Sequence, residues 1–556
     1  MLPFLALSAV VLAVILGYAS VYVREEYGRL ASIIASLDID GFTGEGPPSL
    51  SRQAQVVLTD LVTGASAFEV TNITRDLEWM PSASMEGLRV TKAYKSESSS
   101  EGEKGFFNKN KLMSKVNGKK AIIVGTIRMG FGHHRIAYAA CSWALATKKY
   151  EVYFHDLLAV DAPEANLIGD SHKMYRKSSK MATELGGPFE WIHGFMTRNG
   201  DSTSLRSTAL IAARLTPLLR GLPKNAPVIA SHSLVAISAT LSGVTDKVVN
   251  LVIDNHPQWF VVAPTAVNLV QGPRNYLGFI AKTGRVDGNL RLAGHWIPQE
   301  LVTSAEADAN LREARLMAKA KNATAHPLRL LVPIGGAGAQ RKFITGFLKN
   351  LADDVKRGEV ALIINAGDHD DVRDAIVSAL AEVYLDKNIH FVKTVDDLRT
   401  FADNLLLDID GLSPAEVLKK KHKNDKKAPF TVPRVTVCAF DDYFAAVSAT
   451  DILARGVDLM AAKPSELAFY PVPKLMIRRV GDHEAYSANR ANELGEGTAE
   501  VRNFMEAVSH VRIFTKHPEP LIFMNAALKR NALMGVYDGA KNAVAIATTP
   551  AHFSSS

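Results

Sequence analysis

Cysteine is nearly absent from this chain of 556 residues. Only Cys141 and Cys438 occur, and neither belongs to a CxxC pair. Two distant cysteines cannot build a disulfide framework or a structural zinc site, so the sequence indicates a protein of a reducing compartment. An extreme charge is lacking too, because 64 Lys and Arg against 57 Asp and Glu leave a formal net charge of +7. This mild excess suits an anionic partner without choosing among membrane, nucleotide and nucleic acid.

The composition also lacks any sign of wholesale disorder. Hydrophobic residues make up 47% of the chain and charged residues 22%, which is ordinary for a globular protein. A chain of 556 residues is too long for one hydrophobic core. We therefore expect two domains with additional segments.

The first apolar segment lacks charge altogether. Residues 2 to 23 read LPFLALSAVVLAVILGYASVYV, which is long enough to span a bilayer. No Lys or Arg precedes this segment, whereas Arg24 and Arg29 follow it. The positive-inside rule then predicts a single-pass anchor in the cell membrane with the catalytic part on the cytoplasmic side. The alternative is a cleaved signal peptide ending near GYA, although the segment has no basic start and is long for one.

Alternating patterns define the rest of the chain. Residues 95 to 120 are rich in Ser, Gly and Lys and are interpreted as a linker. After it, short apolar runs alternate with helical patterns, and a second such series starts after residue 320, which indicates parallel βαβ units. The predicted fold is α/β, with two doubly wound Rossmann-like domains facing a cleft. The expected divisions are an anchor at 1–23, a juxtamembrane region and linker at 24–118, an N-terminal domain at 119–300, a C-terminal domain at 301–515 and a C-terminal helix or tail at 516–556.

Polar residues and glycines follow several predicted strands of the N-terminal domain. Ligands bind beyond the carboxyl ends of parallel strands, so these positions are candidates for a site. In MGFGHHR the glycines allow close backbone approach, the helix that follows attracts an anion, and a histidine can act as a general base. The alternative is a tight turn with two exposed histidines. The candidates are Gly130, Gly132, His133, His134, Ser231, His232, Asp254 and His256.

A second glycine-rich turn, VPIGGAGAQRKF, follows the first strand of the C-terminal domain. Its glycines, Gly335, Gly336 and Gly338, could present backbone N–H groups to a diphosphate or simply form a tight turn. Common motifs are missing elsewhere: no GK[ST] makes a Walker loop, and no GxSxG makes a hydrolase elbow. The acidic run GDHDD at residues 367–371 is better explained as a helix start than as a metal site.

Taken in order, these segments resemble a family. Residues 120 to 510 are similar to GT-B glycosyltransferases, most closely the diacylglycerol glycosyltransferases of the monogalactosyldiacylglycerol synthase type, with MurG as a more distant relative. The resemblance lies in GFGHHRIAYAA, VIASHS, LVIDNHPQWF, LAGHWIP, LLVPIGGAG and KPSELAFYPVPKLMI…GDHEAYSANRANELGEG. The donor segment departs from the family pattern, because its usual glycine-proline-glycine turn is replaced by AKPSE.

The resemblance implies an inverting hexosyltransferase that uses a nucleotide sugar and a lipid acceptor such as diacylglycerol. We expect the nucleotide of the donor to be UDP. It implies no cofactor, no metal and no nucleic-acid partner, and it implies contact with an anionic membrane surface. His133 or its neighbour His134 would be the base, with Asp254 orienting the histidine or replacing it. The donor would be held by Gly335, Gly336, Gly338, Lys463, Ser465, Glu466, Asp482, His483, Glu484 and Asn489.

Within that donor set, a helix starting near Pro464 would face the diphosphate, with Ser465 at its start and Glu466 accepting hydrogen bonds from the ribose. Alternatively, Ser465 only caps this helix. Two other functions stay open for the whole protein. One is a catalytically silent scaffold or lipid-binding protein of the same fold, and the other is a nucleotide-sugar epimerase.

Overall fold

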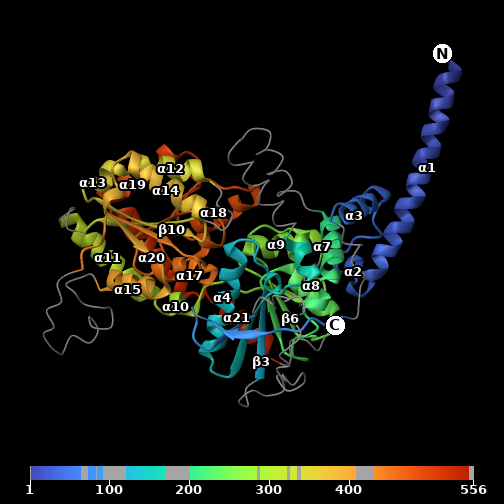
Figure 1. Ribbon diagram of the computed structural model, residues 1–556, viewed down its shortest axis with the longest axis horizontal. Helices are drawn as coiled ribbons and strands as arrows, with labels where there is room; N and C mark the ends of the chain where they lie inside the picture. Colours follow the sequence, from blue (N-terminus) through green and yellow to red (C-terminus); the bar gives the residue numbers. More distant parts are fainter. Residues whose placement is uncertain are drawn as a thin grey trace, which may run out of the picture.

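The computed structural model describes residues 2–63, 73–82, 84–91, 120–169, 201–284, 289–321, 326–334, 340–407 and 430–549. Most of the predicted linker at residues 95–120 lies outside them. Figure 1 shows two α/β bodies side by side, with a long N-terminal helix rising from one of them.

The N-terminal body is built on a sheet of eight strands in the order β1-β2-β4-β3-β5-β6-β7-β8. β1 runs antiparallel to β2, and every other pair is parallel, as the alternation of strands and helices predicted. The strands are β1 (Trp79–Pro81), β2 (Leu88–Thr91), β3 (Lys120–Thr126), β4 (Tyr150–Asp156), β5 (Val228–Ala230), β6 (Val248–Leu251), β7 (Val267–Val270) and β8 (Leu290–Leu292). The helices around them are α4 (Phe131–Ala146), α7 (Ser202–Arg214), α8 (Ser233–Leu241) and α9 (Pro273–Thr283).

The C-terminal body contains a fully parallel sheet of six strands in the order β11-β12-β10-β9-β13-β14. Its strands are β9 (Leu328–Pro333), β10 (Val360–Gly367), β11 (Ile389–Val392), β12 (Val435–Ala439), β13 (Leu459–Ala462) and β14 (Lys474–Met476). Its helices are α10 (Gln299–Thr303), α11 (Ala305–Lys321), α12 (Arg341–Asn350), α13 (Ala352–Lys356), α14 (Asp370–Glu382), α15 (Val395–Leu406), α17 (Tyr443–Ala454), α18 (Ala485–Glu493), α19 (Phe504–Lys516) and α20 (Glu519–Leu533). Two doubly wound Rossmann-like domains are therefore confirmed.

Each sheet has a point at which the strand order reverses, because successive strands are added first on one side of the initial strand and then on its other side. In the N-terminal sheet β3 lies between β4 and β5, and in the C-terminal sheet β9 lies between β10 and β13. Strands that are buried on both faces account for the uninterrupted apolar runs of the sequence; all eight residues of β10 are buried. Ligand sites form at such reversal points, beyond the carboxyl ends of the strands.

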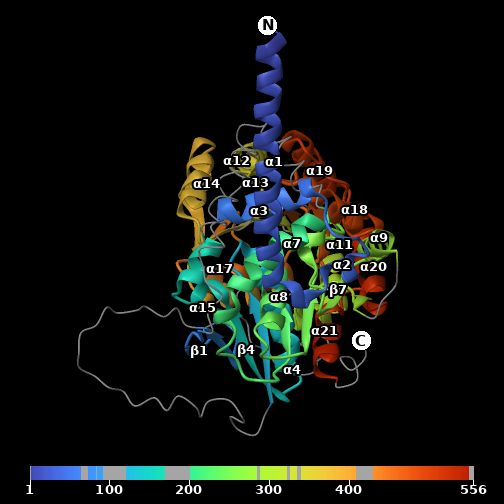
Figure 2. The same ribbon diagram turned by 90° about the vertical axis from the view of Figure 1, so that its right-hand side faces the viewer.

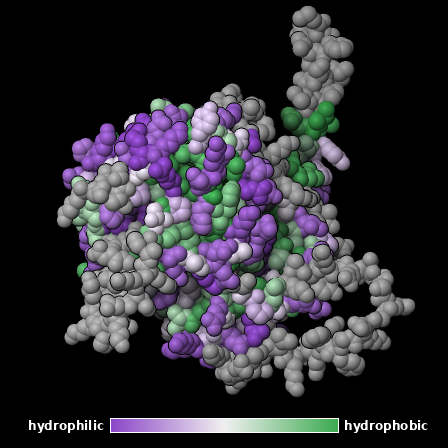
Figure 3. Space-filling view, turned by 60° about the vertical axis from the view of Figure 1, so that its left-hand side comes forward, coloured by the Kyte–Doolittle hydropathy of each residue, from purple (hydrophilic) through white to green (hydrophobic). Residues whose placement is uncertain are grey.

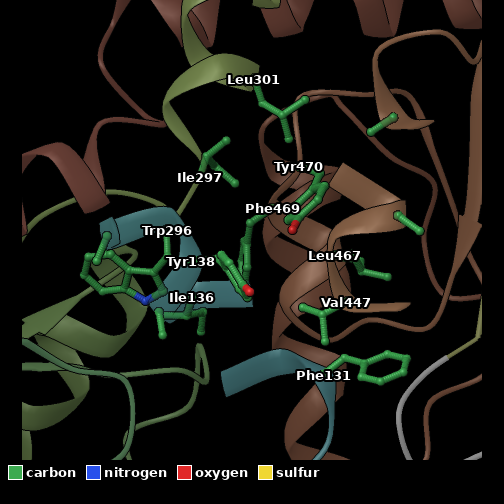
Figure 4. Packing of buried hydrophobic residues seen from close by; sticks show 14 of the residues in the cluster. Phe131, Ile136, Tyr138, Trp296, Ile297, Leu301, Val447, Leu467, Phe469 and Tyr470 are labelled. Carbon is green, nitrogen blue, oxygen red and sulfur yellow. The ribbon is translucent and has the colours of Figure 1, made fainter. Parts of the chain in front are cut away.

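Helix α4 of the N-terminal domain packs against the C-terminal domain. Its side chains share one hydrophobic cluster with residues of the C-terminal domain, and Figure 4 shows Tyr138 next to Phe469. The last helix, α21 (Gly539–Thr548), leaves the C-terminal domain and packs against α4. The apolar interface therefore fixes the start of α4 against the C-terminal domain.

The N-terminal segment forms α1 (Leu2–Ile33), α2 (Ile39–Thr43) and α3 (Leu50–Thr63). The foot of α1 packs on α3 and α7 through a small cluster of Leu30, Val56, Val57 and Leu210. Beyond this cluster α1 projects away from the body in two perpendicular views (Figures 1 and 2), and hydrophobic residues lie at the outer end of its described part (Figure 3).

The predicted anchor, residues 2 to 23, falls on α1, and the side chains of residues up to 13 lie outside the described part. Among the residues that are described, no helix combines the length and the apolar character needed to cross a bilayer.

Candidate functional site

The predicted glycine elbow lies at the reversal point of the N-terminal sheet, between β3 and α4. Gly130 is the N-cap residue of α4 and has a φ of 98°, a conformation that side-chain-bearing residues rarely adopt. Its carbonyl oxygen accepts a hydrogen bond of 3.1 Å from the Tyr443 hydroxyl of α17. The elbow of one domain is therefore held directly by the other domain.

His133 is half-buried in the first turn of α4. Its Nδ1 lies 2.6 Å from the carbonyl oxygen of Ser231, which follows β5. A carbonyl can only accept, so Nδ1 carries the proton and the lone pair is on Nε2. Burial lowers the pKa of His133, against the opposing effects of the Ser231 hydrogen bond and the charges of Asp254 and Glu466. His133 is thus a neutral imidazole, in the form that a general base requires.

His134, the next residue, is fully buried. Its Nδ1 lies 2.9 Å from the Tyr443 hydroxyl, and its Nε2 lies 3.5 Å from a carboxylate oxygen of Asp156. Burial lowers its pKa well below the ordinary value. Of the two candidate bases, only His133 is accessible, and His134 belongs to the interior.

The remaining N-terminal candidates surround His133. The Ser231 hydroxyl is buried and donates to Thr126 at 2.9 Å, so this serine supplies its carbonyl rather than its hydroxyl. His232 is the N-cap of α8, where its Nδ1 accepts the Leu234 N–H at 3.1 Å, and its ring lies 4.5 Å from that of His133. His232 therefore serves helix α8 and packs against the candidate base.

Asp254 and His256 face the C-terminal domain. A carboxylate oxygen of Asp254 lies 4.0 Å from Nε2 of His483, and the His256 ring stacks on Tyr486 with centroids 4.4 Å apart. Tyr486 also carries the Arg274 guanidinium 4.0 Å above its ring. These contacts connect the two domains beyond the reversal point of the N-terminal sheet.

The predicted donor helix near Pro464 is wrong. Residues after β13 form only a four-residue 3₁₀ turn, η7 (Glu466–Phe469), and the Ser465 side chain makes no cap hydrogen bond. Pro471 and Pro473 follow, and β14 begins at Lys474, so neither the backbone donors nor the space for an α-helix remain. This turn offers no helix N-terminus to a diphosphate.

Glu466 crosses the domain interface. It forms an ion pair with Arg135 of α4, and the two side chains are 10% and 1% exposed. Arg135 also donates to the Thr450 hydroxyl at 3.1 Å. Burial opposes ionisation of Glu466, but the charges of Arg135 and Lys463 outweigh it and hold the pKa of the carboxyl below its ordinary value. The carboxylate is thus committed to Arg135 and not free for a ribose.

Three other predicted donor residues make contacts within the protein. Lys463 pairs with Glu484, which also accepts the Val480 N–H at 2.7 Å. Asp482 pairs with Arg479 at 3.1 Å, and Asn489 is exposed on α18. Gly335, Gly336 and Gly338 lie outside the described residues. Arg135, Tyr443 and Thr450 belong to this site as well, and no motif of the sequence marks them. Tyr443 alone has a local signal, because it follows the predicted strand RVTVCAF.

A cavity of about 570 Å³ opens at the carboxyl ends of β10, β11 and β12. Phe391 and Phe440 give it aromatic walls, and Asp368 and Asp441 add carboxylates. Gly367 lines this cavity, and a Cβ atom added to it would lie 2.8 Å from the Phe131 ring, next to the elbow. Across the described ranges, no three or more His, Cys, Asp or Glu side chains are grouped to hold a metal ion.

Comparisons with known proteins follow the same division into two parts. Residues 85–281 match the family described as "Domain of unknown function (DUF6937)", and residues 286–548 match "Domain of unknown function (DUF6938)". No curated protein matches this chain in sequence.

Three solved structures illustrate the likeness in shape. UDP-GlcNAc 2-epimerase from Neisseria meningitidis, bound to UDP-GlcNAc, is 11% identical over 76% of this chain and 98% of its own, with a TM-score of 0.40. The α,α-trehalose 6-phosphate synthase from Burkholderia multivorans is 11% identical over 77% and 98%, with a TM-score of 0.37. Spinosyn rhamnosyltransferase SpnG, complexed with thymidine diphosphate, is 11% identical over 76% and 98%, with a TM-score of 0.31. All three TM-scores are below 0.5, so the fold assignment stands on the sheets and connections of this chain itself.

Proposed function

We propose that this protein transfers a hexose from a nucleotide-sugar donor to an acceptor hydroxyl, with His133 as the general base. The hydrogen bond from His133 Nδ1 to the Ser231 carbonyl carries the proposal, because it leaves Nε2 unprotonated at the reversal point of the sheet. Nε2 takes the hydroxyl proton while the acceptor oxygen attacks the anomeric carbon. The bond from that carbon to the diphosphate breaks on the opposite side, so the configuration inverts.

The donor is proposed to be a nucleoside diphosphate sugar, UDP-linked, used without a metal or a cofactor. Support comes from the cavity of about 570 Å³ beside the elbow, whose size and lining suit a nucleoside. Phe391 and Phe440 offer aromatic surface to a base, and the carboxylate of Asp441 can accept hydrogen bonds from ribose hydroxyls.

The acceptor is proposed to be a membrane lipid such as diacylglycerol, with the catalytic domains on the cytoplasmic side of the cell membrane. Support comes from the uncharged segment of residues 2 to 23 and from its exposed apolar side chains. Val14, Ile15 and Tyr18 are 65%, 57% and 78% exposed, which is costly in water and favourable in lipid.

A transfer assay tests this function. The purified full chain is incubated with radiolabelled nucleotide sugars and vesicles containing diacylglycerol, and the products are separated by lipid extraction. Labelled lipid that is lost in His133→Gln and retained in His510→Gln, a partly exposed histidine of α19, would support the proposal. Conversion of the free nucleotide sugar without an acceptor would indicate an epimerase instead.

The Arg135–Glu466 ion pair favours a second candidate, a catalytically silent protein of the same fold. A buried carboxylate of the protein occupies the start of α4, where an anionic substrate is expected. No turnover and no binding of any nucleotide sugar to the wild-type chain or to Glu466→Gln would identify such a scaffold.

A further inference from the structure

A small cavity lies at the amino ends of β9 and β13, on the edge of the C-terminal sheet opposite its ligand-binding edge. Pro327 directly precedes β9, and Asp458 directly precedes β13. Of the seven residues that line this cavity, Asp458 is the single acidic one. Four of the seven are basic: Arg315, Lys319, His326 and Arg329. Positive charge is therefore gathered at an edge of the sheet that the proposed sugar transfer does not use.

Two of these cations come from one face of helix α11. Arg315 and Lys319 are four residues apart, so their side chains are neighbours on the helix surface. They are only 4% and 5% exposed. Arginine and lysine are almost never buried to this extent unless a partner compensates their charge, because removing a charge from water is costly. Each of the two side chains therefore requires negative charge nearby.

The carboxylate of Asp458 meets this requirement only in part. One of its oxygens accepts the Arg315 Nε at 2.9 Å, and the other accepts the backbone N–H of Arg329 at 3.0 Å. Both oxygens of the carboxylate are thus in use. Nη2 of Arg315 is buried and has no hydrogen-bond partner in the part of the chain that the structure describes. An arginine normally engages an anion through two of its N–H groups, and here one buried group is left over.

The ammonium group of Lys319 faces oxygens that carry no charge. It donates to the backbone carbonyls of Glu359 at 2.9 Å and His326 at 3.3 Å. Burial lowers the pKa of Lys319, against the opposing charges of Asp458 and Glu359. The Glu359 carboxylate is itself paired with Arg357 at 3.0 Å. Within the described ranges Lys319 forms no ion pair, so the wall of the cavity holds more positive than negative charge.

The size of the cavity limits what can fill it. Its volume is about 10 Å³, which is the room taken by the centre of one water-sized particle. A phosphate group or an organic carboxylate is too large for this space. A water molecule fits, but it would bring no negative charge to the two buried cations. A halide ion is the anion of matching size, and it can accept hydrogen bonds from several N–H groups at once.

We propose that a chloride ion occupies this cavity, held by Arg315 and Lys319, and that it stabilises the C-terminal domain. The ion would accept the remaining Arg315 N–H and compensate the charge of Lys319. It would thereby connect α11 to the starts of β9 and β13. This site goes beyond the proposed function, because it lies at the opposite edge of the sheet and requires no sugar transfer.

Thermal unfolding of the full chain tests the proposal. The Tm is measured at constant ionic strength while sodium chloride replaces sodium gluconate, whose anion is too large for the cavity. We expect the Tm to rise by roughly 5 to 10 °C when chloride reaches about 100 times its dissociation constant. An identical Tm in chloride and in gluconate would overturn the proposal.

Two variants test the contribution of charge. Lys319→Gln keeps a donor for the two carbonyls but loses the charge, so it should weaken the chloride dependence of the Tm at least 10-fold. Asp458→Asn acts in the opposite direction, because it removes the competing negative charge and should tighten chloride binding at least 10-fold. Lys529→Gln is the matched control: this lysine of α20 pairs with Glu313 of the same helix α11 at 2.9 Å but does not line the cavity. Chloride affinity that is unchanged in both Lys319→Gln and Asp458→Asn would mean that the cavity holds water.

Crystals of the wild-type protein grown in sodium bromide give a direct readout, since bromide scatters anomalously and replaces chloride. An anomalous peak within hydrogen-bond distance of Arg315 Nη2 and Lys319 Nζ would support the site. Density for a water molecule there, without anomalous signal, would overturn it. Neither measurement depends on enzyme activity, so this site and the proposed function can fail separately.

Discussion

His133 Nδ1 lies 2.6 Å from the carbonyl oxygen of Ser231, and this contact separates two adjacent histidines into different roles. His133 faces the reversal point, and its tautomer is fixed by the backbone carbonyl of Ser231, which follows β5. Its neighbour His134 faces the opposite way, into the interior between the domains. A one-residue step along a helix turns the side chain by about 100°, which is enough to leave His133 partly accessible and His134 fully buried.

His133→Gln and His134→Gln should therefore differ in kind. His133→Gln should lower turnover by roughly 10² to 10⁴, the usual size of general-base catalysis, and leave the Tm nearly unchanged. His134→Gln should lower the free energy of unfolding by about 1 to 3 kcal/mol, because it disturbs a buried hydrogen bond. Steady-state kinetics and thermal melts of both variants check this. Full activity in a normally folded His133→Gln would contradict the role of the base.

Gly132→Ala tests whether the Arg135–Glu466 contact exists in solution. Alanine normally stabilises a helix by up to about 1 kcal/mol relative to glycine. Here the new Cβ would lie 2.9 Å from the Glu466 carboxylate, which the ion pair with Arg135 holds in place, so we expect destabilisation instead. Urea unfolding measures whether Gly132→Ala raises or lowers the free energy of unfolding. In a Glu466→Ala background, Gly132→Ala should stabilise, whereas stabilisation in the wild-type background would mean that the two residues are apart.

Tyr443→Phe should loosen the elbow. The hydroxyl donates to the Gly130 carbonyl at 3.1 Å and contacts His134 Nδ1 at 2.9 Å, so its removal takes a partner from the half-buried Gly130 carbonyl and from the buried His134 ring. We expect a loss of about 1 to 3 kcal/mol in the free energy of unfolding. Tyr384→Phe is the control, since Tyr384 is 81% exposed and should be neutral. Equal stability of the two variants would show that the hydroxyl contributes nothing.

Asp451 should make stability depend on pH in an unusual direction. Burial raises its pKa to about 6, although the charge of Arg135 and the hydrogen bond from Tyr470 oppose the shift. A carboxyl whose pKa is higher in the folded state binds its proton more tightly there, so its contribution to stability falls as pH rises from about 4 to about 6.

Asp451→Asn has no ionisable group at this position, so its stability should not fall as Asp451 ionises. The amide oxygen of the asparagine can still accept the hydrogen bond from the Tyr470 hydroxyl. Relative to the wild type, the free energy of unfolding of the variant should increase by up to about 3 kcal/mol between pH 4 and pH 8. Most of this increase should be reached just above pH 6. Melting curves at both pH values, compared between the two proteins, measure the difference. A gap in Tm that does not change with pH would show that Asp451 ionises normally.

Much of the architecture could be predicted because parallel strands buried on both faces require unbroken apolar runs. The stretches around β3, β9 and β10 have that pattern, and the polar residues at their ends mark the ligand-binding edge of each sheet. The failure near Pro464 had a local cause that was visible in the sequence: two prolines follow within nine residues, and an α-helix cannot continue through them.

The chain alone therefore determined the two Rossmann-like domains, the glycine elbow and the presence of a histidine beside it, since these depend on local patterns of apolar residues and glycines. Only the tertiary structure decided which histidine is available and what Glu466 contacts. Arg135 and Glu466 are far apart along the chain and meet because α4 packs into the C-terminal domain. Such a contact depends on how two domains pack, and no spacing along the sequence encodes it.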